Sequence, residues 1–177
     1  EQARPLSELR QMIADAAAEG DVEALQDAEF LMENYRGYRN YPPETEEWFL
    51  RQDVIVGSSC CQALIHSYYQ SDDTRMEQHQ RDGVICGFLF YSNDAIPPHT
   101  LVELRAQLEE QLQALSGEDA TILGGAIGMR YSYIDCMCFD LKSFLNTACG
   151  VLNQYELEEI GFHVFRVDCG GVNLKNE

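Results

Sequence analysis

The sequence predicts an α+β protein whose C-terminal unit, residues 83–177, has the ferredoxin-like βαββαβ arrangement. Short apolar runs rich in β-branched and aromatic residues alternate with segments in which apolar residues recur every three or four positions. The stretch Thr121–Asp140 reads as two strands joined by a glycine-rich turn, with a strand and a helix on either side of it. This order predicts a four-stranded antiparallel sheet with two helices on one face.

The elements of the C-terminal unit can be justified in chain order. The apolar run Gly83–Asn93 predicts a buried strand. A helix should begin at a capping box that starts with Thr100 and should end at Gly117. After the hairpin, Asp140 should cap a second helix, and the last strand is expected over residues 161–168. The two crossovers have ~20 residues each, which is long enough for right-handed connections between parallel strands.

Residues 1–82 are expected to form an N-terminal helical segment that packs on the C-terminal unit. Apolar residues at helical spacing predict an αα-hairpin over residues 5–35. A third helix is expected over residues 45–69, where the run VIVGSSCC has poor helix propensity and leaves a short strand at 53–56 as the alternative. The polar residues 70–82 read as a solvated connection between the two units.

The charge of the chain limits its partners. The 177 residues include 30 Asp and Glu but only 12 Lys and Arg, which gives a net charge of −18 at pH 7. A field of this sign repels phosphate, so nucleic acid and anionic membrane surfaces are disfavoured as partners. It attracts cations over a long range and so suits a basic protein partner, although it also serves solubility alone.

The cysteines indicate a cytoplasmic protein. Most of the seven sit in apolar runs, where a free cysteine behaves as a small hydrophobic residue. A chain of this length and apolar content does not need a disulfide scaffold, so a reducing compartment is expected. No run approaches the ~18 apolar residues of a membrane helix. No signal peptide is recognisable, although the start at Glu1 leaves a removed leader open.

Side chains alternate between the two faces of a strand, so helices on one side of the sheet cover only half of them. In the third strand we assign the face with the smaller side chains to the helices: Ser132, Ile134, Cys136 and Cys138. The far face then carries the larger side chains of the third strand and part of the last strand: Tyr131, Tyr133, Asp135, Met137, Phe139, Phe162, Val164, Arg166 and Asp168. A face this apolar must be covered by the N-terminal helices, by a second copy of the chain or by a partner.

The candidate site lies on this far face. It consists of side chains from the hairpin and the last strand: Arg130, Tyr131, Tyr133, Asp135 and Arg166. An arginine and a carboxylate on adjacent strands, beside two tyrosines, could line a small pocket or meet a partner. The same residues could instead form an ordinary cross-strand ion pair.

Other patterns predict structure rather than chemistry. Cys136 and Cys138 lie on the same side of a strand, and no spacing marks the two further ligands that a metal would need. Cys60 and Cys61 have a histidine nearby, but nothing in the sequence shows the positive setting that activates a thiol. The glycines within residues 124–128 lead into a strand, so they predict a hairpin rather than a phosphate loop. We therefore predict no catalytic residue, metal or cofactor.

These observations lead to two hypotheses about function. The first is a non-enzymatic protein-binding module, for example an immunity or inhibitor protein for a basic partner, which the charge and the lack of a catalytic constellation favour. The alternative is a small-molecule site, enzymatic or regulatory, between the sheet face and the N-terminal helices. The cluster of tyrosines, aspartate and arginine favours this alternative. A homodimer formed through the sheet face is a further option.

Overall fold

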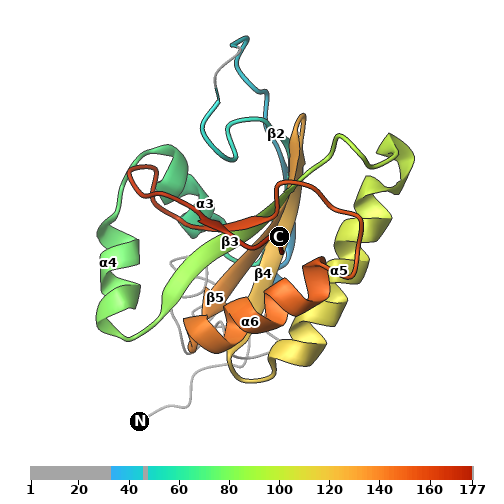
Figure 1. Cartoon of the computed structure of the whole chain (residues 1–177). Coiled ribbons are helices and arrows are strands. Elements are labelled where there is room, and N and C mark those ends of the chain that lie inside the picture. Colours follow the sequence, from blue (N-terminus) through green and yellow to red (C-terminus); the bar gives the residue numbers. More distant parts are fainter. Residues whose placement is uncertain (1–32, 46–47, 177) are drawn as a thin grey trace.

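The computed structural model describes residues 33–45 and 48–176, which form a mixed fold of helices around one antiparallel sheet (Figure 1). The α+β class predicted from the sequence is therefore confirmed. The strands are β1 (Arg36–Arg39), β2 (Val54–Ser59), β3 (Ile85–Ser92), β4 (Ala120–Gly128), β5 (Tyr131–Cys138), β6 (Gly161–Val164) and β7 (Val172–Asn173). The helices are α3 (Gln62–Tyr69), α4 (Thr74–Arg81), the short 3-10 helix η2 (Pro98–Thr100), α5 (Leu101–Ser116) and α6 (Leu141–Leu152). The αα-hairpin expected over residues 5–35 falls almost entirely outside the described residues.

The sheet has seven strands in the order β1-β2-β4-β5-β3-β6-β7, and all neighbouring strands are antiparallel. The sequence predicted four strands, and β1, β2 and β7 extend the sheet at its two edges. The hairpin expected at Thr121–Asp140 is formed by β4 and β5. Strand β5 also pairs with β3 over its whole length, so the hairpin lies at the centre of the sheet.

The helix expected over residues 45–69 is wrong in its first part. Residues Val54–Ser59 form β2, close to the alternative strand at 53–56, and α3 begins only at Gln62. β-Branched residues favour a strand, and β2 gains a backbone ladder with β4 that a helix would forgo.

The connection expected over residues 70–82 contains helix α4. Its sequence, TRMEQHQR, is rich in residues that favour helices. Met76 and His79 lie three positions apart on one face of this helix, and both are buried. Two buried side chains in eight residues give a weak periodic signal, so the polar composition concealed the helix.

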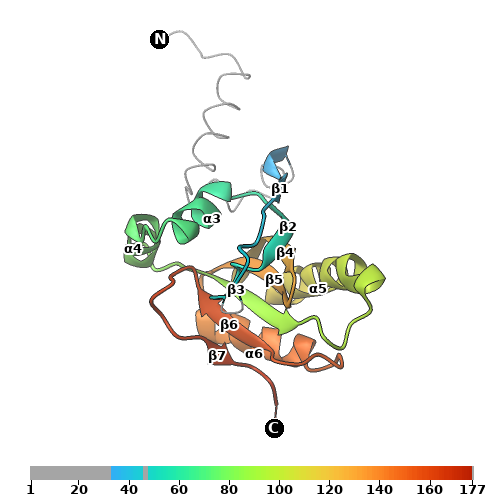
Figure 2. The same cartoon turned by 90° about the horizontal axis from the view of Figure 1, so that it is seen from above.

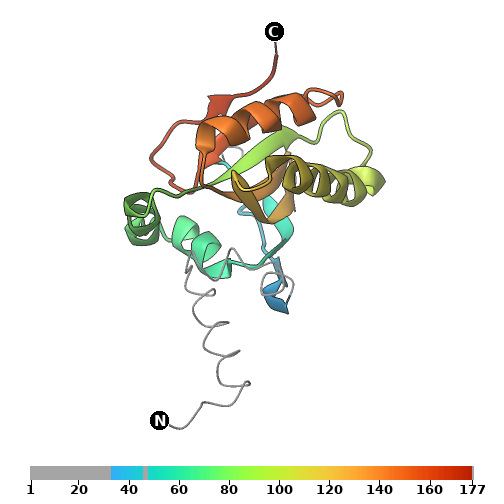
Figure 3. The same ribbon diagram turned by 90° about the horizontal axis from the view of Figure 1, so that it is seen from below.

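Helices cover both faces of the sheet, as Figures 2 and 3 show from opposite directions. On one face, side chains of α5 and α6 pack with those of the strands beneath them: Leu89, Leu108, Leu112, Ile134 and Phe144. On the other face, side chains of α3 and α4 pack with another set from the same strands: Leu64, Tyr68, Met76, Phe88 and Tyr133. The chain itself therefore covers the far face, and α3 and α4 contribute the covering helices.

Strand β5 has the faces that the sequence predicted, but the last strand is inverted relative to the prediction. Phe162 of β6 lies opposite Leu89 of β3 and packs in the cluster under α5 and α6. Its neighbour His163 lies opposite Phe88 on the far face, with the ring centroids 5.4 Å apart. The alternation of side chains separates the two faces of a strand, but it does not show which face packs against α5 and α6. The strand also ends at Val164, earlier than predicted.

Candidate functional site

A short segment before β2, residues 49–53, closes the centre of the far face, and we call it the strap. The strap places Arg51 in the interior, with no exposed surface and a left-handed φ of 71°. This conformation is uncommon for a residue with a side chain. Contacts to the backbone of Arg51 hold it there: its N–H donates to the hydroxyl of Tyr133 at 2.9 Å, and its carbonyl accepts from the hydroxyl of Tyr69 at 2.7 Å.

The guanidinium of Arg51 meets the carboxylate of Asp135 in the middle of β5. One terminal nitrogen donates to Oδ1 of Asp135, and the other donates to the hydroxyl of Tyr38 at 2.7 Å. Three aromatic rings also surround the guanidinium, each with its centroid 5.3 Å from Cζ: Phe88, Tyr133 and Phe165. A cation over an aromatic face is attracted to it, and the attraction grows when water is excluded. Arg51 therefore links the strap to the neighbouring strands β3 and β5, to Tyr38 of the edge strand β1, and to Phe165 just beyond the end of β6.

Burial sets the electrostatics of this pair, because Arg51 and Asp135 are at most 1% exposed. Burial raises the pKa of Asp135, and the Arg51 guanidinium opposes that rise. Burial also lowers the pKa of Arg51, but the Asp135 carboxylate and the neighbouring tyrosines raise it by more. A guanidinium does not lose its proton in a protein, so Arg51 stays charged and favours the ionised form of Asp135. Either residue without the other would be a buried, uncompensated charge.

Asp53, at the end of the strap, holds the turn between β4 and β5. Its Oδ2 accepts hydrogen bonds from the backbone N–H groups of Arg130 and Tyr131, at 2.9 and 3.1 Å. Its Oδ1 accepts a hydrogen bond from the hydroxyl of Tyr133. Gly128 leaves room for this carboxylate, because a Cβ at that position would lie 2.2 Å from Oδ2 of Asp53. The strap therefore fixes both the centre and the tip of the hairpin.

The structure brings together only two of the five residues of the predicted site. Tyr133 and Asp135 are buried beneath the strap. Arg130 is exposed at the tip of the hairpin. The hydroxyl of Tyr131 donates a hydrogen bond to the carboxylate of Glu159, in the loop before β6.

The remaining predicted residue, Arg166, is engaged elsewhere. Its terminal nitrogen lies 3.0 Å from Asp168 and 3.2 Å from Asp73, beyond the end of β6. The arginine that pairs with Asp135 is instead Arg51, which the sequence reasoning missed. Arg51 lies in a charged segment for which the sequence predicts a helix, and no spacing relates it to β5. Only the fold of the strap brings the two together.

Five of the seven cysteines are buried, and Cys149 and Cys169 are partly exposed. Burial raises the pKa of Cys60 to about 12, which disfavours the reactive thiolate. The sulfurs of Cys136 and Cys138 are 3.8 Å apart on the face of β5 that α5 and α6 cover. Within the described ranges, no group of three or more His, Cys, Asp or Glu side chains is placed to hold a metal ion.

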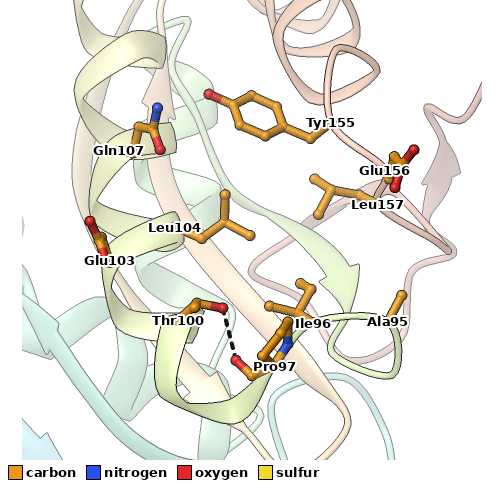
Figure 4. A pocket seen from close by; sticks show the side chains of 10 residues that line it. All are labelled: Ala95, Ile96, Pro97, Thr100, Glu103, Leu104, Gln107, Tyr155, Glu156 and Leu157. Atoms are coloured by element: carbon orange, nitrogen blue, oxygen red, sulfur yellow. Dashed lines mark hydrogen bonds between the residues drawn. The ribbon is translucent and has the colours of Figure 1, made fainter.

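A pocket of about 310 Å³ lies on the α5 and α6 side of the sheet, between the first turns of α5 and the loop that follows α6 (Figure 4). It is lined by Ala95, Ile96, Pro97, Thr100, Glu103, Leu104, Gln107, Tyr155, Glu156 and Leu157. In Figure 4, Glu103 and Glu156 stand on opposite sides of an apolar floor that includes Leu104. The hydroxyl of Tyr155 donates to Oε1 of Gln111 at 3.0 Å, which holds its ring at one end of the pocket. None of the five residues of the predicted site lines this pocket.

Two exposed carboxylates, Glu103 and Glu156, line the pocket, and two more, Asp94 and Glu158, are next in sequence to lining residues. We call these four residues the acidic rim. None of these four forms an ion pair with another described residue. A hydrogen bond of 2.9 Å from the N–H of Ser92 to the carbonyl of Glu158 ties the loop to the end of β3. Two basic residues lie near the rim. The carbonyl of Arg130 accepts a hydrogen bond from the N–H of Asn93, which precedes Asp94. The ammonium of Lys175 donates to the carbonyl of Leu157. The rim therefore has four carboxylates, against two basic residues nearby.

Comparisons with models of protein families, with curated proteins and with solved structures found no match for this chain. Across the helices that the structure describes, none has the length and apolar character needed to cross a membrane.

Proposed function

We propose that the protein is a non-enzymatic binding module that holds a basic protein at its acidic rim, in the manner of an inhibitor or immunity protein. The observation that carries this proposal is the rim itself. Two exposed carboxylates line the pocket, two more are next in sequence to lining residues, and none of the four forms an ion pair among the described residues. Such groups are ready to meet an incoming cation, because no existing ion pair has to be broken.

The rest of the chain strengthens the attraction of this surface for cations. The net charge of −18 produces a long-range field that steers a positively charged partner and can raise the association rate about 10- to 1,000-fold. Salt screens this field over about 10 Å at 0.1 M ionic strength. Charges at the edge of an interface act mainly on the association rate, so the rim should govern how fast the partner binds.

Two finer features belong to the same proposal. We infer that residues 83–177 form a ferredoxin-like unit, which the partial strand order β4-β5-β3-β6 and the packing of α5 and α6 on one face support. We also place the protein in the cytoplasm, which the seven free cysteines support. The homodimer through the sheet face and the small-molecule alternative stay predictions. Arg51, from the strap, fills the space beside Tyr133 and Asp135 on that face.

The test is binding of a fluorescent arginine- and lysine-rich peptide to the full chain, followed by anisotropy at low and physiological salt. We expect binding that weakens steeply as salt rises, and no binding of a glutamate-rich peptide of the same length. The triple variant E103Q/E156Q/E158Q should bind about tenfold more weakly than the unchanged protein, since each exposed charge contributes up to about 1 kcal/mol.

A second triple variant, E44Q/D82N/E118Q, serves as the matched control. It removes the same number of exposed carboxylates from positions that do not line the pocket. We expect its affinity to change by less than about twofold, because the field of the whole protein is spread over many charges. Equal losses in both variants would mean that only the total charge matters and would overturn the proposal. Failure of the peptide to bind at low salt would overturn it as well.

A further inference from the structure

The pocket inside the acidic rim combines an apolar floor with two charged walls. Ile96, Leu104 and Leu157 supply the floor, and Glu103 and Glu156 stand on either side of it (Figure 4). Its volume of about 310 Å³ is at the lower end of the range for ligand pockets, which is about 300–1,000 Å³. A space of this size can hold one long side chain.

We propose that this pocket receives the side chain of one arginine of the basic partner, an inference that rests on the binding function proposed above. The methylene stem of an arginine can lie on an apolar floor while its charged end reaches polar groups at the edge. Here the stem would lie on Leu104 and Leu157, and the guanidinium would sit at the edge of the pocket, in the field of Glu103 on one side and of Glu156 on the other. Both carboxylates are exposed and form no ion pair among the described residues, so a cation that approaches either of them breaks no existing ion pair.

The ring of Tyr155 favours arginine over lysine. It lies at one end of the pocket, and its hydroxyl is bonded to Gln111, so its position is fixed before a ligand arrives. A planar guanidinium stacks on an aromatic ring and binds a carboxylate through two parallel hydrogen bonds, whereas a lysine ammonium acts as a point charge. The same chain already surrounds Arg51 with aromatic rings and a carboxylate, which shows how these groups hold a guanidinium.

Two features near the pocket oppose a cation, namely the N-terminus of α5 and the ammonium of Lys175, which donates to the carbonyl of Leu157. Helix α5 begins at Leu101, and a helix N-terminus carries about half a positive charge. Glu103 lies in the first turn of this helix and already offsets that partial charge. The carboxylate of Glu156 on the opposite wall offsets the ammonium of Lys175, and Asp94 and Glu158 of the acidic rim leave the surroundings of the pocket negative. An anionic ligand would have to enter between the carboxylates of Glu103 and Glu156, so a cationic ligand is favoured.

Titration of the isotope-labelled full chain with N-acetyl-arginine amide, followed by NMR, tests this inference. We expect the amide signals of residues 95–107 and 155–157 to shift and to saturate. The citrulline analogue, which has nearly the same shape but no charge, should leave them unchanged, and the lysine analogue should bind more weakly. E103Q and E156Q should each weaken arginine binding about threefold, in line with the energy of an exposed charge pair. D82N/E118Q is the control and should have no effect.

The outcomes separate this inference from the proposed function. Equal binding of arginine and citrulline, or shifts confined to other residues, would overturn the arginine pocket. If the basic peptide binds at the rim but its affinity is unchanged in E103Q/E156Q and after replacement of its arginines by citrulline, the pocket fails while the binding function stands. If arginine amide occupies the pocket but no basic peptide binds at low salt, the binding function fails and the pocket stands.

Discussion

The guanidinium of Arg51 donates a hydrogen bond to the carboxylate of Asp135, although the two residues are 84 positions apart in the chain. The pair lies in the interior, where neither side chain is more than 1% exposed. It joins the strap to the central strand β5, and three aromatic rings complete its surroundings. The covering of the far face therefore depends on an ionic contact inside an aromatic core.

Replacement of Arg51 by Met should lower the free energy of unfolding by about 3–5 kcal/mol, because Asp135 would be left as a buried charge without a partner. D135N should be similarly costly, since Arg51 keeps its charge. In R51M/D135N neither charge remains, so the loss should be smaller than the sum of the two single losses by more than about 1 kcal/mol. Urea unfolding of the four proteins measures this. Additive losses would show that the two side chains do not interact.

The hydroxyl of Tyr133 joins the middle of the strap to its end, because it accepts from the N–H of Arg51 and donates to the carboxylate of Asp53. Y133F should therefore cost about 1–3 kcal/mol, the range for leaving buried polar groups without partners. Y41F removes a hydroxyl from a residue that is 87% exposed and should change stability by less than about 0.5 kcal/mol. Thermal and urea unfolding of both variants provide the test. A neutral Y133F would mean that water replaces these hydrogen bonds.

Replacement of glycine by alanine should change the stability of the protein in opposite directions at two positions. Gly124 in β4 has φ of 139°, and a Cβ there would lie 2.1 Å from the carbonyl oxygen of Ser58 in β2. G124A should cost about 3 kcal/mol or more, since both the backbone conformation and the β2–β4 contact are strained. Gly150 lies in α6, and a Cβ there would meet no atom beyond its own helical turn within 4 Å, so G150A should stabilise the protein by about 0.5–1 kcal/mol. Differential scanning calorimetry distinguishes the two signs.

The hydrogen bond from Tyr131 to Glu159 should make stability depend on pH in the alkaline range. Burial, and then the hydrogen bond and charge of Glu159, raise the pKa of Tyr131 from 10.0 to about 12. Because the folded value is the higher one, the stabilisation is fully present below pH 10 and is lost as the pH rises from 10 to about 12. The difference in unfolding free energy between the unchanged protein and Y131F should shrink over this window.

E159Q is the control for this pH dependence. It retains an acceptor for the Tyr131 hydroxyl but removes the negative charge, so the pKa of Tyr131 should fall back toward 10.0. Absorbance of the ionised tyrosine, followed as the difference between each protein and its Y131F counterpart, gives the pKa directly. An unchanged pKa in E159Q would mean that burial alone causes the shift.

Local patterns in the sequence were sufficient for the elements of residues 83–152. The leucine spacing of α5 and the apolar run of β3 are properties of single segments. Such patterns can be recognised without knowing what the segment packs against. The same alternation placed Tyr133 and Asp135 on one face of β5 and led to the expectation of an arginine beside them. Local patterns predicted a helix where β2 lies, because the backbone ladder that favours the strand is formed with β4, far along the chain.

The sequence by itself determined the α+β class, the central hairpin, the two faces of β5 and the large negative charge. Only the tertiary structure decided that Arg51 rather than Arg166 pairs with Asp135. It also decided that Phe162 packs under α5 and α6, and that Glu103 and Glu156 flank one pocket. The physical reason is that helix and strand periodicity are set by the backbone of a single segment. Register, strand order and the path of a loop are set by contacts between segments, and no single stretch of sequence carries them.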